Sequence, residues 1–423
     1  MAQLTIAGID IGSSTIKIAI AELIEGSDQK SAGLHLLGSL VHPTEGMQKG
    51  VVSNVDDVVA TLSSALEKAE RLIGVPLTRA NITIGFPQLF MQSSRGLVAV
   101  SKVNGEIKSE DVDRVVEAAQ TITTPPNYEM LHVLPRTFAV DGQAGVIDPV
   151  GMVGTRLEVD AEIIYAPTSH MRNLTKALYR TGCEIDDVVF SALAGAEAML
   201  DKRARDVGSV LINIGFSTTS LIVFEDGNVL HAAVLPVGSN HVTGDIAIGL
   251  RTSLDVAERI KREHGTALVD RTSKRDEVSW EDVGDMQNTG TFSKRSVAEI
   301  IEARVEELFE MVDKELKKMD RSGMLPGGAI LCGGGAFLDG IADVAKRVLK
   351  LPAALAMMPP SGIEGAEDVR GLEMAQVLGL LLWSSRAQGG STGGWGKGLA
   401  TMVGSFQKKP MELIGKLRDM LPW

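Results

Sequence analysis

Two short segments, far apart in the chain, combine glycine with hydroxyl side chains at the end of an apolar run. Glycine lets backbone N–H groups approach a phosphate closely, and serine and threonine hydroxyls add further donors. In the first segment Lys17 adds a positive charge, and Asp10 is expected to hold Mg²⁺ through water, because Mg²⁺ keeps several waters and uses few carboxylates. The candidate phosphate-binding residues are Asp10, Gly12, Ser13, Ser14, Thr15 and Lys17 in the first segment and Gly215, Ser217, Thr218 and Thr219 in the second.

A third candidate is the glycine triplet Gly333-Gly334-Gly335, which follows the apolar run Ile330–Cys332. A helix is expected at Leu338–Leu349, and glycines at a helix N-terminus can receive a phosphate or let an adenine ring lie against the backbone. Each of the three segments, taken alone, fits a plain turn about as well. The chain contains neither the P-loop pattern nor the dinucleotide-binding pattern.

The first two segments each join strands in the same order, which indicates an internal repeat. The strands expected in the first copy are Leu4–Ile11, Ile16–Leu23 and Leu34–Val41, and those in the second are Ser209–Ile214, Leu221–Phe224 and Val229–Leu235. Strand, glycine turn and return strand are typical of a β-hairpin. The repeat predicts an α/β fold in which two similar halves flank a nucleotide.

Between the two copies, residues 86–164 combine short strands with one helix and lack a glycine loop. We expect a small inserted α+β subdomain there, with its helix at Glu110–Ile122 and Ser109 as the cap. Asp270–Lys294 is polar and favours a loop or a short hairpin. The other expected helices are Val55–Ile73, Met171–Thr181, Ala192–Arg205, Val242–Leu250, Ser253–His264 and Val297–Met319.

Composition narrows the function. The 423 residues carry a formal net charge of −12, which argues against nucleic-acid binding because that requires a basic surface. Cys183 and Cys332 are too few and too far apart for a disulfide framework or a zinc site, as expected of a protein in a reducing cytoplasm.

The C-terminal end differs from the rest of the chain. Residues 387–409 are glycine-rich and predict a flexible linker. Residues 410–423 form an amphipathic helix when placed at about 100° per residue. From Lys408 onward, four basic and two acidic side chains give a local charge of +2, which suits an interfacial helix on anionic lipid. The alternative, a helix that docks on its own domain, is disfavoured by the long linker. The expected lipid-facing residues are Leu413, Ile414, Leu417, Met420, Leu421 and Trp423.

These features resemble the actin, sugar-kinase and chaperone ATPase superfamily and, within it, the FtsA family of bacterial cell-division proteins. The similarity covers nearly the whole chain. It is most specific at residues 235–247 (LPVGSNHVTGDIA), 255–261 (DVAERIK), 131–135 (LHVLP) and 149–152 (PVGM), and in the C-terminal tail.

The resemblance implies ATP and Mg²⁺ as ligands, with the first two segments facing each other across the phosphates. Gly238 and Ser239 would lie near the phosphates, while Glu258 and Lys261 or Arg262 would reach ribose and adenine. Without the family, those charges fit a solvated helix face better. Gly334, Gly335 and Ala336 would contact the adenosine. It also implies a scaffold at the cytoplasmic face of the cell membrane at the division site, which forms filaments with itself, anchors the tubulin-like protein FtsZ and recruits other divisome proteins.

The resemblance further implies a division into subdomains. The first core subdomain would comprise residues 1–85, 165–206 and 371–386, and the insertion residues 86–164. The second core subdomain would comprise 207–243 and 325–370, with an outer subdomain at 244–324 that carries the FtsZ contact.

This chain departs from the family pattern in the second segment. Asn213 stands where an aspartate is expected, Phe216 and Ser217 replace glycines, and Ser239 replaces a glycine beside Gly238. Asparagine can neither accept a proton as a general base nor give Mg²⁺ a negative ligand, so we expect ATP binding with very slow hydrolysis. One rival function is a small-molecule kinase, which needs a carboxylate base; Asn213 removes one natural candidate for it. The other is an actin-like pilus-assembly adaptor, which is not expected to carry the membrane tail.

Overall fold

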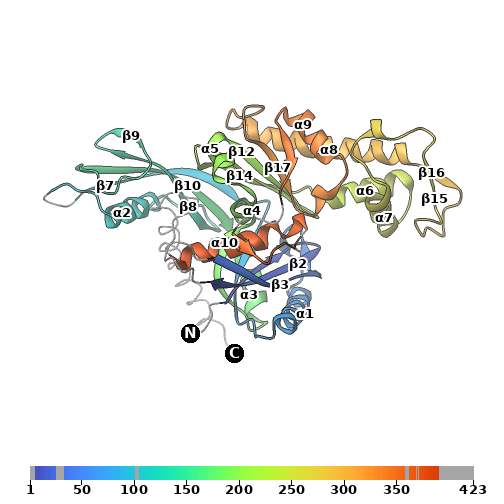
Figure 1. Ribbon diagram of the computed structural model, residues 1–423, viewed down its shortest axis with the longest axis horizontal. Coiled ribbons are helices and arrows are strands. Elements are labelled where there is room, and N and C mark those ends of the chain that lie inside the picture. The colour runs from blue at the N-terminus through green and yellow to red at the C-terminus, as the bar shows by residue number, and fades with distance from the viewer. Residues whose placement is uncertain are drawn as a thin grey trace.

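The computed structural model describes residues 5–24, 33–100, 104–357, 362–367, 369 and 371–389. Two β-sheets lie one above the other in Figure 1, with α4 and α10 between them. The inserted sheet extends to one end of the long axis and a helical lobe to the other. The expected linker beyond residue 389 and the amphipathic helix lie outside the described residues.

The first half is built on a six-stranded sheet with the order β11-β6-β1-β2-β3-β19. β1, β2 and β3 are antiparallel neighbours, and β6 runs parallel to β1 on its other side. The short hairpin β4–β5 follows β3. The strands are β1 (Thr5–Ile11), β2 (Thr15–Ile24), β3 (Gly33–Pro43), β4 (Met47–Gln48), β5 (Val51–Val52), β6 (Arg79–Ile84), β11 (Glu184–Phe190) and β19 (Ile363–Glu364).

The second half repeats this arrangement in a five-stranded sheet with the order β14-β13-β12-β17-β18. β12, β13 and β14 are antiparallel, and β17 runs parallel to β12 on its other side. The expected repeat is therefore present as a repeat of strand order and direction. The strands are β12 (Ser209–Ile214), β13 (Thr219–Glu225), β14 (Asn228–Leu235), β17 (Gly328–Cys332) and β18 (Ala353–Leu355).

Helix α1 (Val55–Ile73) begins and ends where the sequence predicts, because residues at both of its ends cap the helix. The Asn54 side chain accepts hydrogen bonds from the first-turn amides, and Gly74 ends the helix in the left-handed conformation. Val58 and Leu62 are fully buried against the first sheet. The other core helices are α3 (Thr168–Tyr179), α4 (Ser191–Met199), α5 (Lys202–Val207), α9 (Ile341–Leu349) and α10 (Ala375–Gly389).

The helices expected to begin at Met171, Val242 and Val297 begin three residues earlier, at Thr168, Ser239 and Lys294. Three other expected helices differ in more than their first residues. Ala192–Arg205 is two helices, α4 and α5, because Leu200 is extended and Asp201 accepts the amide of Ala204 at 2.7 Å as a new N-cap. The expected helix Leu338–Leu349 begins only after Gly340, and the 3₁₀ turn η2 (Gly334–Phe337) precedes it. The glycine triplet is thus not at an α-helix N-terminus. The remaining 3₁₀ turns are η1 (Val269–Arg271) and η3 (Leu372–Met374).

The third difference lies in the insertion, where four strands in the order β7-β10-β8-β9 pack against α2. Ser109 is the first residue of α2 rather than its cap; Lys108 precedes it, and Asp111 accepts the Lys108 amide at 3.0 Å. Gly96 allows close packing, since a Cβ there would lie 2.1 Å from the Val115 carbonyl oxygen in α2. The elements are β7 (Phe90–Ala99), α2 (Ser109–Ala119), β8 (Tyr128–Val140), β9 (Gln143–Val146) and β10 (Arg156–Pro167).

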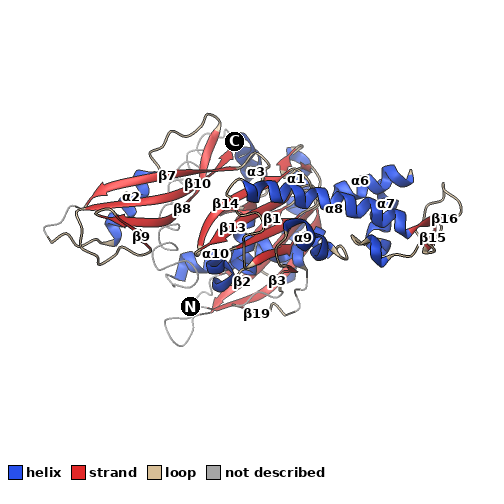
Figure 2. Ribbon diagram, turned by 90° about the horizontal axis from the view of Figure 1, so that it is seen from above, coloured by secondary structure: helices blue, strands red, loops and turns tan. Residues whose placement is uncertain are grey.

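The lobe at the opposite end of the molecule consists of the helices α6, α7 and α8 and a short hairpin, whose bounds are given below; Figure 2 shows its place. The hairpin lies in the polar segment where the sequence favours a loop or short hairpin, and Trp280 packs on Phe292 at a centroid distance of 4.7 Å. Among the described helices of the whole chain, none has the length and apolar character needed to cross a membrane. The lobe's elements are α6 (Ser239–Leu250), α7 (Leu254–His264), β15 (Glu277–Ser279), β16 (Thr291–Ser293) and α8 (Lys294–Lys317).

Candidate functional site

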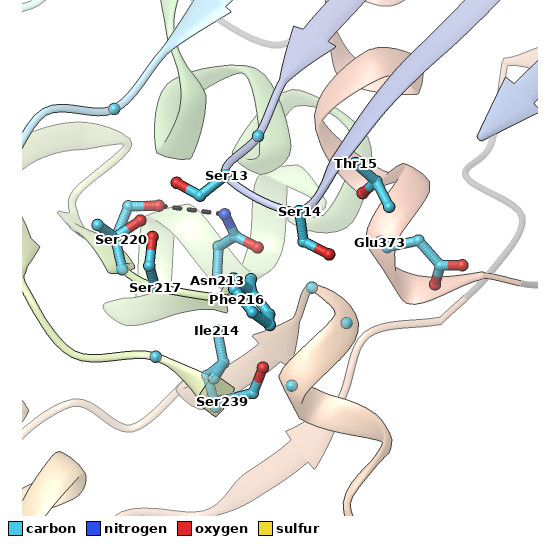
Figure 3. A pocket seen from close by; sticks show the side chains of 18 of the residues that line it. Ser13, Ser14, Thr15, Asn213, Ile214, Phe216, Ser217, Ser220, Ser239 and Glu373 are labelled. Atoms are coloured by element: carbon cyan, nitrogen blue, oxygen red, sulfur yellow. Dashed lines mark hydrogen bonds between the residues drawn. The ribbon is translucent and has the colours of Figure 1, made fainter. Parts of the chain in front are cut away.

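A cavity of about 560 Å³ lies between the two halves, where the β1–β2 and β12–β13 hairpins face each other. Its size lies within the usual range of small-molecule sites. Figure 3 shows Ser13 and Ser14 of the first hairpin opposite Asn213, Ser217 and Ser220 of the second. Both turns close with the same backbone bond, from Gly12 N to Thr15 O at 3.0 Å and from Gly215 N to Thr218 O at 2.9 Å.

The first hairpin carries a charged cluster. Asp10 pairs in register with Lys17 on β2 and with Thr83 on β6, so the three side chains share one face of the sheet. The Lys17 ammonium lies 2.8 Å from Asp10 Oδ2, and the Thr83 hydroxyl donates to Asp10 Oδ1 at 2.5 Å. The lysine and aspartate side chains are only 12% and 14% exposed. A positive and a negative charge are therefore fixed at the cavity wall.

The turn of the first hairpin is held from outside by the segment between β3 and α1. The Ser13 hydroxyl accepts the amide of Gly50 at 2.9 Å, and the Ser14 carbonyl accepts the amide of Thr44 at 2.9 Å. Gly50 has φ +75°, and a Cβ there would lie 2.4 Å from the Gly85 carbonyl oxygen. Only glycine fits this position, so the hydrogen bond from the Gly50 amide to Ser13 depends on a glycine there.

The second hairpin carries a neutral cluster at the matching positions. Asn213 pairs in register with Ser220, and its amide nitrogen donates to the Ser220 hydroxyl at 3.3 Å. The Ser220 hydroxyl in turn lies 3.5 Å from that of Ser191, at the start of α4. Cys332 occupies the place that Thr83 has in the first half. Burial raises the pKa of the Cys332 thiol to about 12, so it is no nucleophile at neutral pH.

The hydroxyls next to this cluster differ in their surroundings. Thr219, a predicted ligand, is fully buried and donates to the Val237 carbonyl at 2.8 Å, so it points into the core and does not line the cavity. Ser217 lines the cavity and is 4% exposed. Its hydroxyl has no hydrogen-bond partner among the described residues.

The N-terminus of α6 braces the second turn. The amide of Ser239 donates to the Gly215 carbonyl at 2.9 Å, and that of Asn240 donates to the Phe216 carbonyl at 2.8 Å. A Cβ at Gly238 would lie 2.5 Å from the Phe216 oxygen, so glycine is needed for this approach. Gly238 and Ser239 do line the cavity, but these first amides of the helix are already engaged.

On the far wall, α7 contributes a cation and an anion that contact each other. The Lys261 ammonium lies 2.6 Å from Glu258 Oε2 and 2.9 Å from the Thr243 hydroxyl, and Arg262 lines the cavity beside them. The Lys261 side chain is only 11% exposed. Lys261 is therefore part of a fixed network, whereas Glu258, whose side chain is 38% exposed, contacts both that network and solvent.

The glycine triplet closes the remaining side. Gly333 has φ +87°, and a Cβ there would lie 2.3 Å from Asn213 Oδ1. Gly334 and Gly335 line the cavity, whereas the predicted Ala336 is buried and does not. The half-exposed Phe337 lines the cavity instead of Ala336.

Most residues predicted to bind the nucleotide line this cavity, but Thr219 and Ala336 do not. The predicted lipid-facing residues of the tail lie outside the described residues. The other predicted cavity-lining residues are Asp10, Gly12, Ser13, Ser14, Thr15, Lys17, Gly215, Ser217, Thr218, Gly238, Ser239, Glu258, Lys261, Arg262, Gly334 and Gly335.

Sequence reasoning missed several further lining residues. Thr83 and Ser220 could have been found by alternation along the strands, because they share a face with Asp10 and Asn213. Ser191 and Gln376 follow no pattern of their own and reach the cavity through the packing of α4 and α10. The missed polar residues are Thr83, Ser191, Ser220, Arg304, Asp339, Glu373 and Gln376.

Two duplicated halves around a common cavity, with a subdomain inserted in the first, define a protein of the actin-like class. A family model described as "Cell division protein FtsA" matches residues 210–379, and one described as "SHS2 domain inserted in FTSA" matches residues 87–165. The chain is 36% identical to the cell division protein FtsA of Bacillus subtilis over 87% of its own length and 82% of the relative's. It is 31% identical to that of Pseudomonas aeruginosa, with 90% of each chain covered. The chain therefore belongs to the FtsA family of cell-division proteins.

Solved structures show the same fold at low identity. A chain of the "PilM-PilN type IV pilus biogenesis complex" is 18% identical with a TM-score of 0.63, covering 90% of this chain and 98% of that one. MreB5 of Spiroplasma citri, solved bound to ADP, is 12% identical with a TM-score of 0.53, covering 90% and 96%. The predicted family and the predicted fold, duplicated actin-like domains with an inserted α+β subdomain, are confirmed.

Proposed function

We propose that this cell-division protein binds ATP with Mg²⁺ between its two hairpins and forms filaments on the cytoplasmic face of the cell membrane at the division site. It would anchor FtsZ there and recruit other divisome proteins. The observation that carries the nucleotide proposal is the pair of hairpins with equal register that face each other across one cavity. The MreB5 structures with ADP and AMPPNP add support, because they share the fold.

The residues present fit a nucleotide. Lys17 and Lys261 supply positive charge at two walls, and the buried hydroxyl of Ser217 has no partner of its own among the described residues. A Cβ added at Gly334 would have no other atom within 4 Å, so a ligand can approach the backbone there.

Magnesium fits less directly. Asp10 would hold the ion through water, and the described residues contain no cluster of three histidine, cysteine or carboxylate side chains that could bind a metal alone. The phosphates and water would have to supply most ligands, as is usual for Mg²⁺. A bound Mg²⁺ would offset the charge of the phosphates.

Slow hydrolysis follows from the neutral cluster. A water that attacks the terminal phosphate has to lose a proton, and Asn213 cannot accept it. We therefore expect ATP to persist in the cavity and to stabilise the closed arrangement of the two halves. The protein would act mainly as a nucleotide-dependent scaffold.

The membrane and partner proposals rest on the sequence of the tail and on the family. One short amphipathic helix binds a membrane weakly and reversibly, but a filament presents many copies, so attachment would become multivalent and much tighter.

The test is sedimentation with anionic lipid vesicles and Mg²⁺-ATP. The full chain should pellet with vesicles, whereas a chain ending at Gln407 should stay in the supernatant, and FtsZ should pellet only with the full chain. A matched control exchanges Leu417→Glu, which keeps the tail's length but places a charge on its apolar face. Equal pelleting of the full and shortened chains would end the membrane proposal, and absence of FtsZ from a pellet that holds the full chain would end the FtsZ proposal alone.

A further inference from the structure

The segment 131–135 (LHVLP) is one of the stretches most similar to the family, yet it does not line the cavity. It belongs to β8 and lies at the base of the insertion, where the inserted sheet meets the rest of the molecule. In Figures 1 and 2 the insertion's strands start near β14 and α10 and extend away from both halves. The segment is therefore placed where either half can hold the insertion.

His132 holds the insertion to the first half. Its Nε2 atom accepts the amide of Phe190, the last residue of β11, at 3.0 Å, and its ring lies edge-on to Trp383 of α10 at a centroid distance of 5.7 Å. Burial lowers the pKa of His132 to about 3, so the ring is neutral, and because Nε2 accepts, Nδ1 carries the proton. This buried N–H has no partner among the described residues, which costs stability. Stability alone therefore does not explain a histidine at this position.

Apolar side chains hold the same base to the second half. Leu134 and Ile164 are buried in the hydrophobic core that also contains Val234 of β14, the edge strand of the second sheet. β14 contacts both β7 and β8. Leu131 packs against this core and against that of the first half. The insertion interrupts the first half in sequence, but its base has one support on each half.

The support on the first half is adjacent to the cavity. Ser191 directly follows Phe190 and lines the cavity, and its hydroxyl lies 3.5 Å from that of Ser220 in the second half. A change in the separation of the two hairpins therefore acts on the residue next to the amide that His132 accepts. The other support moves with the second hairpin, because β14 pairs with β13, which carries Ser220.

We propose that closure of the two halves around a ligand turns the insertion about its base. The natural trigger rests on the proposed function, in which ATP stabilises the closed arrangement. Opening the first support would leave the Phe190 amide unpaired, and opening the second would expose Leu134 and Ile164 to water, so a rotation that keeps both supports is favoured.

The length of β8 converts a small turn at the base into a larger displacement at the far end. The eight residue steps from His132 to Val140 span about 26 Å, so a turn of about 10° moves the far end by about 4–5 Å. Ile147, directly after β9, and Val153 are exposed at that end. The turn would present these apolar side chains differently in the ligand-bound and ligand-free protein.

The test measures the distance between two spin labels in the full chain, with and without Mg²⁺-ATP. Gln143→Cys places one label at the far end of the insertion and Arg71→Cys the other on the first half; both positions are exposed, and Cys183 and Cys332 are buried. ATP should shift this distance by several ångström. His132→Leu, which removes the acceptor of the Phe190 amide, should reduce the shift by half or more and leave ATP affinity nearly unchanged. His132→Gln, whose side-chain carbonyl can accept that amide, should restore it.

Leu157→Ala is the matched control. Leu157 is fully buried in the core between the inserted sheet and α2, so its truncation destabilises the insertion without touching either support. The shift should persist in this variant. A label distance that ATP leaves unchanged although it binds, or a shift that is lost to the same extent in Leu157→Ala and His132→Leu, would overturn the inference.

A second measurement needs no nucleotide. Ser14 and Ser239 lie on opposite sides of the cavity in Figure 3, so Ser14→Cys and Ser239→Cys can be joined by cross-linkers of two lengths that set the separation of the halves. Hydrogen exchange of the β8 amides should differ between the two lengths, and His132→Leu should reduce the difference. Equal exchange at both lengths would overturn the inference. A length-dependent exchange in a chain that binds no ATP would support it and overturn the proposed nucleotide binding alone.

Discussion

The two hairpins have the same backbone and different chemistry. In each, a residue two positions before the turn glycine pairs with the residue five positions after it, and the turn closes with the same hydrogen bond. In the first hairpin that pair is Asp10 and Lys17, at 2.8 Å. In the second it is Asn213 and Ser220, at 3.3 Å. Strand pairing thus keeps the register, while the side chains on it are free to differ.

The difference also changes what each cluster is joined to. The charged cluster stays within the first half, because Thr83 comes from the adjacent strand β6. The neutral cluster reaches across to the first half through Ser220 and Ser191. The first hairpin is therefore suited to binding a charged group of a ligand. The second hairpin is suited to connecting the two halves of the molecule.

The strongest way to break this comparison is to remove the charge at Asp10. Asp10→Ala leaves a largely buried ammonium without its partner, which costs about 3 kcal/mol in the free energy of unfolding. The equivalent Asn213→Ala removes only a neutral hydrogen bond, worth about 1 kcal/mol. Urea unfolding of both variants measures the difference directly.

Nucleotide affinity should follow the same order, with a large loss in Asp10→Ala and a small one in Asn213→Ala. Asp10→Asn is the control for shape, because it keeps the side-chain volume and removes the charge. If the two alanine variants unfolded at the same urea concentration, the hairpins would be energetically alike and the comparison would fail.

A smaller effect is expected when the second hairpin is made to resemble the first. Asn213→Asp introduces a carboxylate that can accept a proton from an attacking water. General-base catalysis contributes about 10²–10⁴-fold, and an imperfectly placed base should give a rise of about tenfold or more in ATP turnover. Steady-state phosphate release checks this, and Asn213→Ser, which offers no base, should show no rise.

The turnover of the unaltered chain also tests the role of Asn213. A robust turnover of the unaltered chain, lost in Asp10→Ala, would show that hydrolysis does not need an acid at position 213. The neutral cluster would then have no bearing on the rate.

The duplication was predictable because it depends on local pattern. Alternating apolar residues and a glycine turn specify strand, register and direction together, so Asp10 and Lys17 could be placed in one site from the sequence. The caps of α1 fixed its ends for the same reason. The break after Leu200 was not predictable, since Ala192–Arg205 has continuous helical character and one capping aspartate decides it.

The partners of the site residues were less predictable than the residues themselves. Thr83 and Ser191 come from strands and helices distant in sequence, and only the packed sheet places them beside Asp10 and Ser220. Thr219 shows the converse, because alternation along β13 turns it into the core although its neighbour Ser220 faces the cavity. A hydroxyl-rich turn indicates a phosphate site but not which hydroxyls face it.

The smallest effect should come from Thr83, where the second half has Cys332 in place of a hydroxyl-bearing side chain. Thr83→Val keeps the shape and removes the donor to Asp10, leaving the carboxylate with Lys17 alone; the loss should be about 1 kcal/mol in the free energy of unfolding. Thr83→Ser keeps the donor and should retain most of the stability apart from the cost of the deleted methyl. Cys332 fills this place in the second half. A valine that cost nothing would mean that the charged cluster needs only Asp10 and Lys17. A loss confined to Thr83→Val would instead show that the third member, from a separate strand, helps to hold the charge in place.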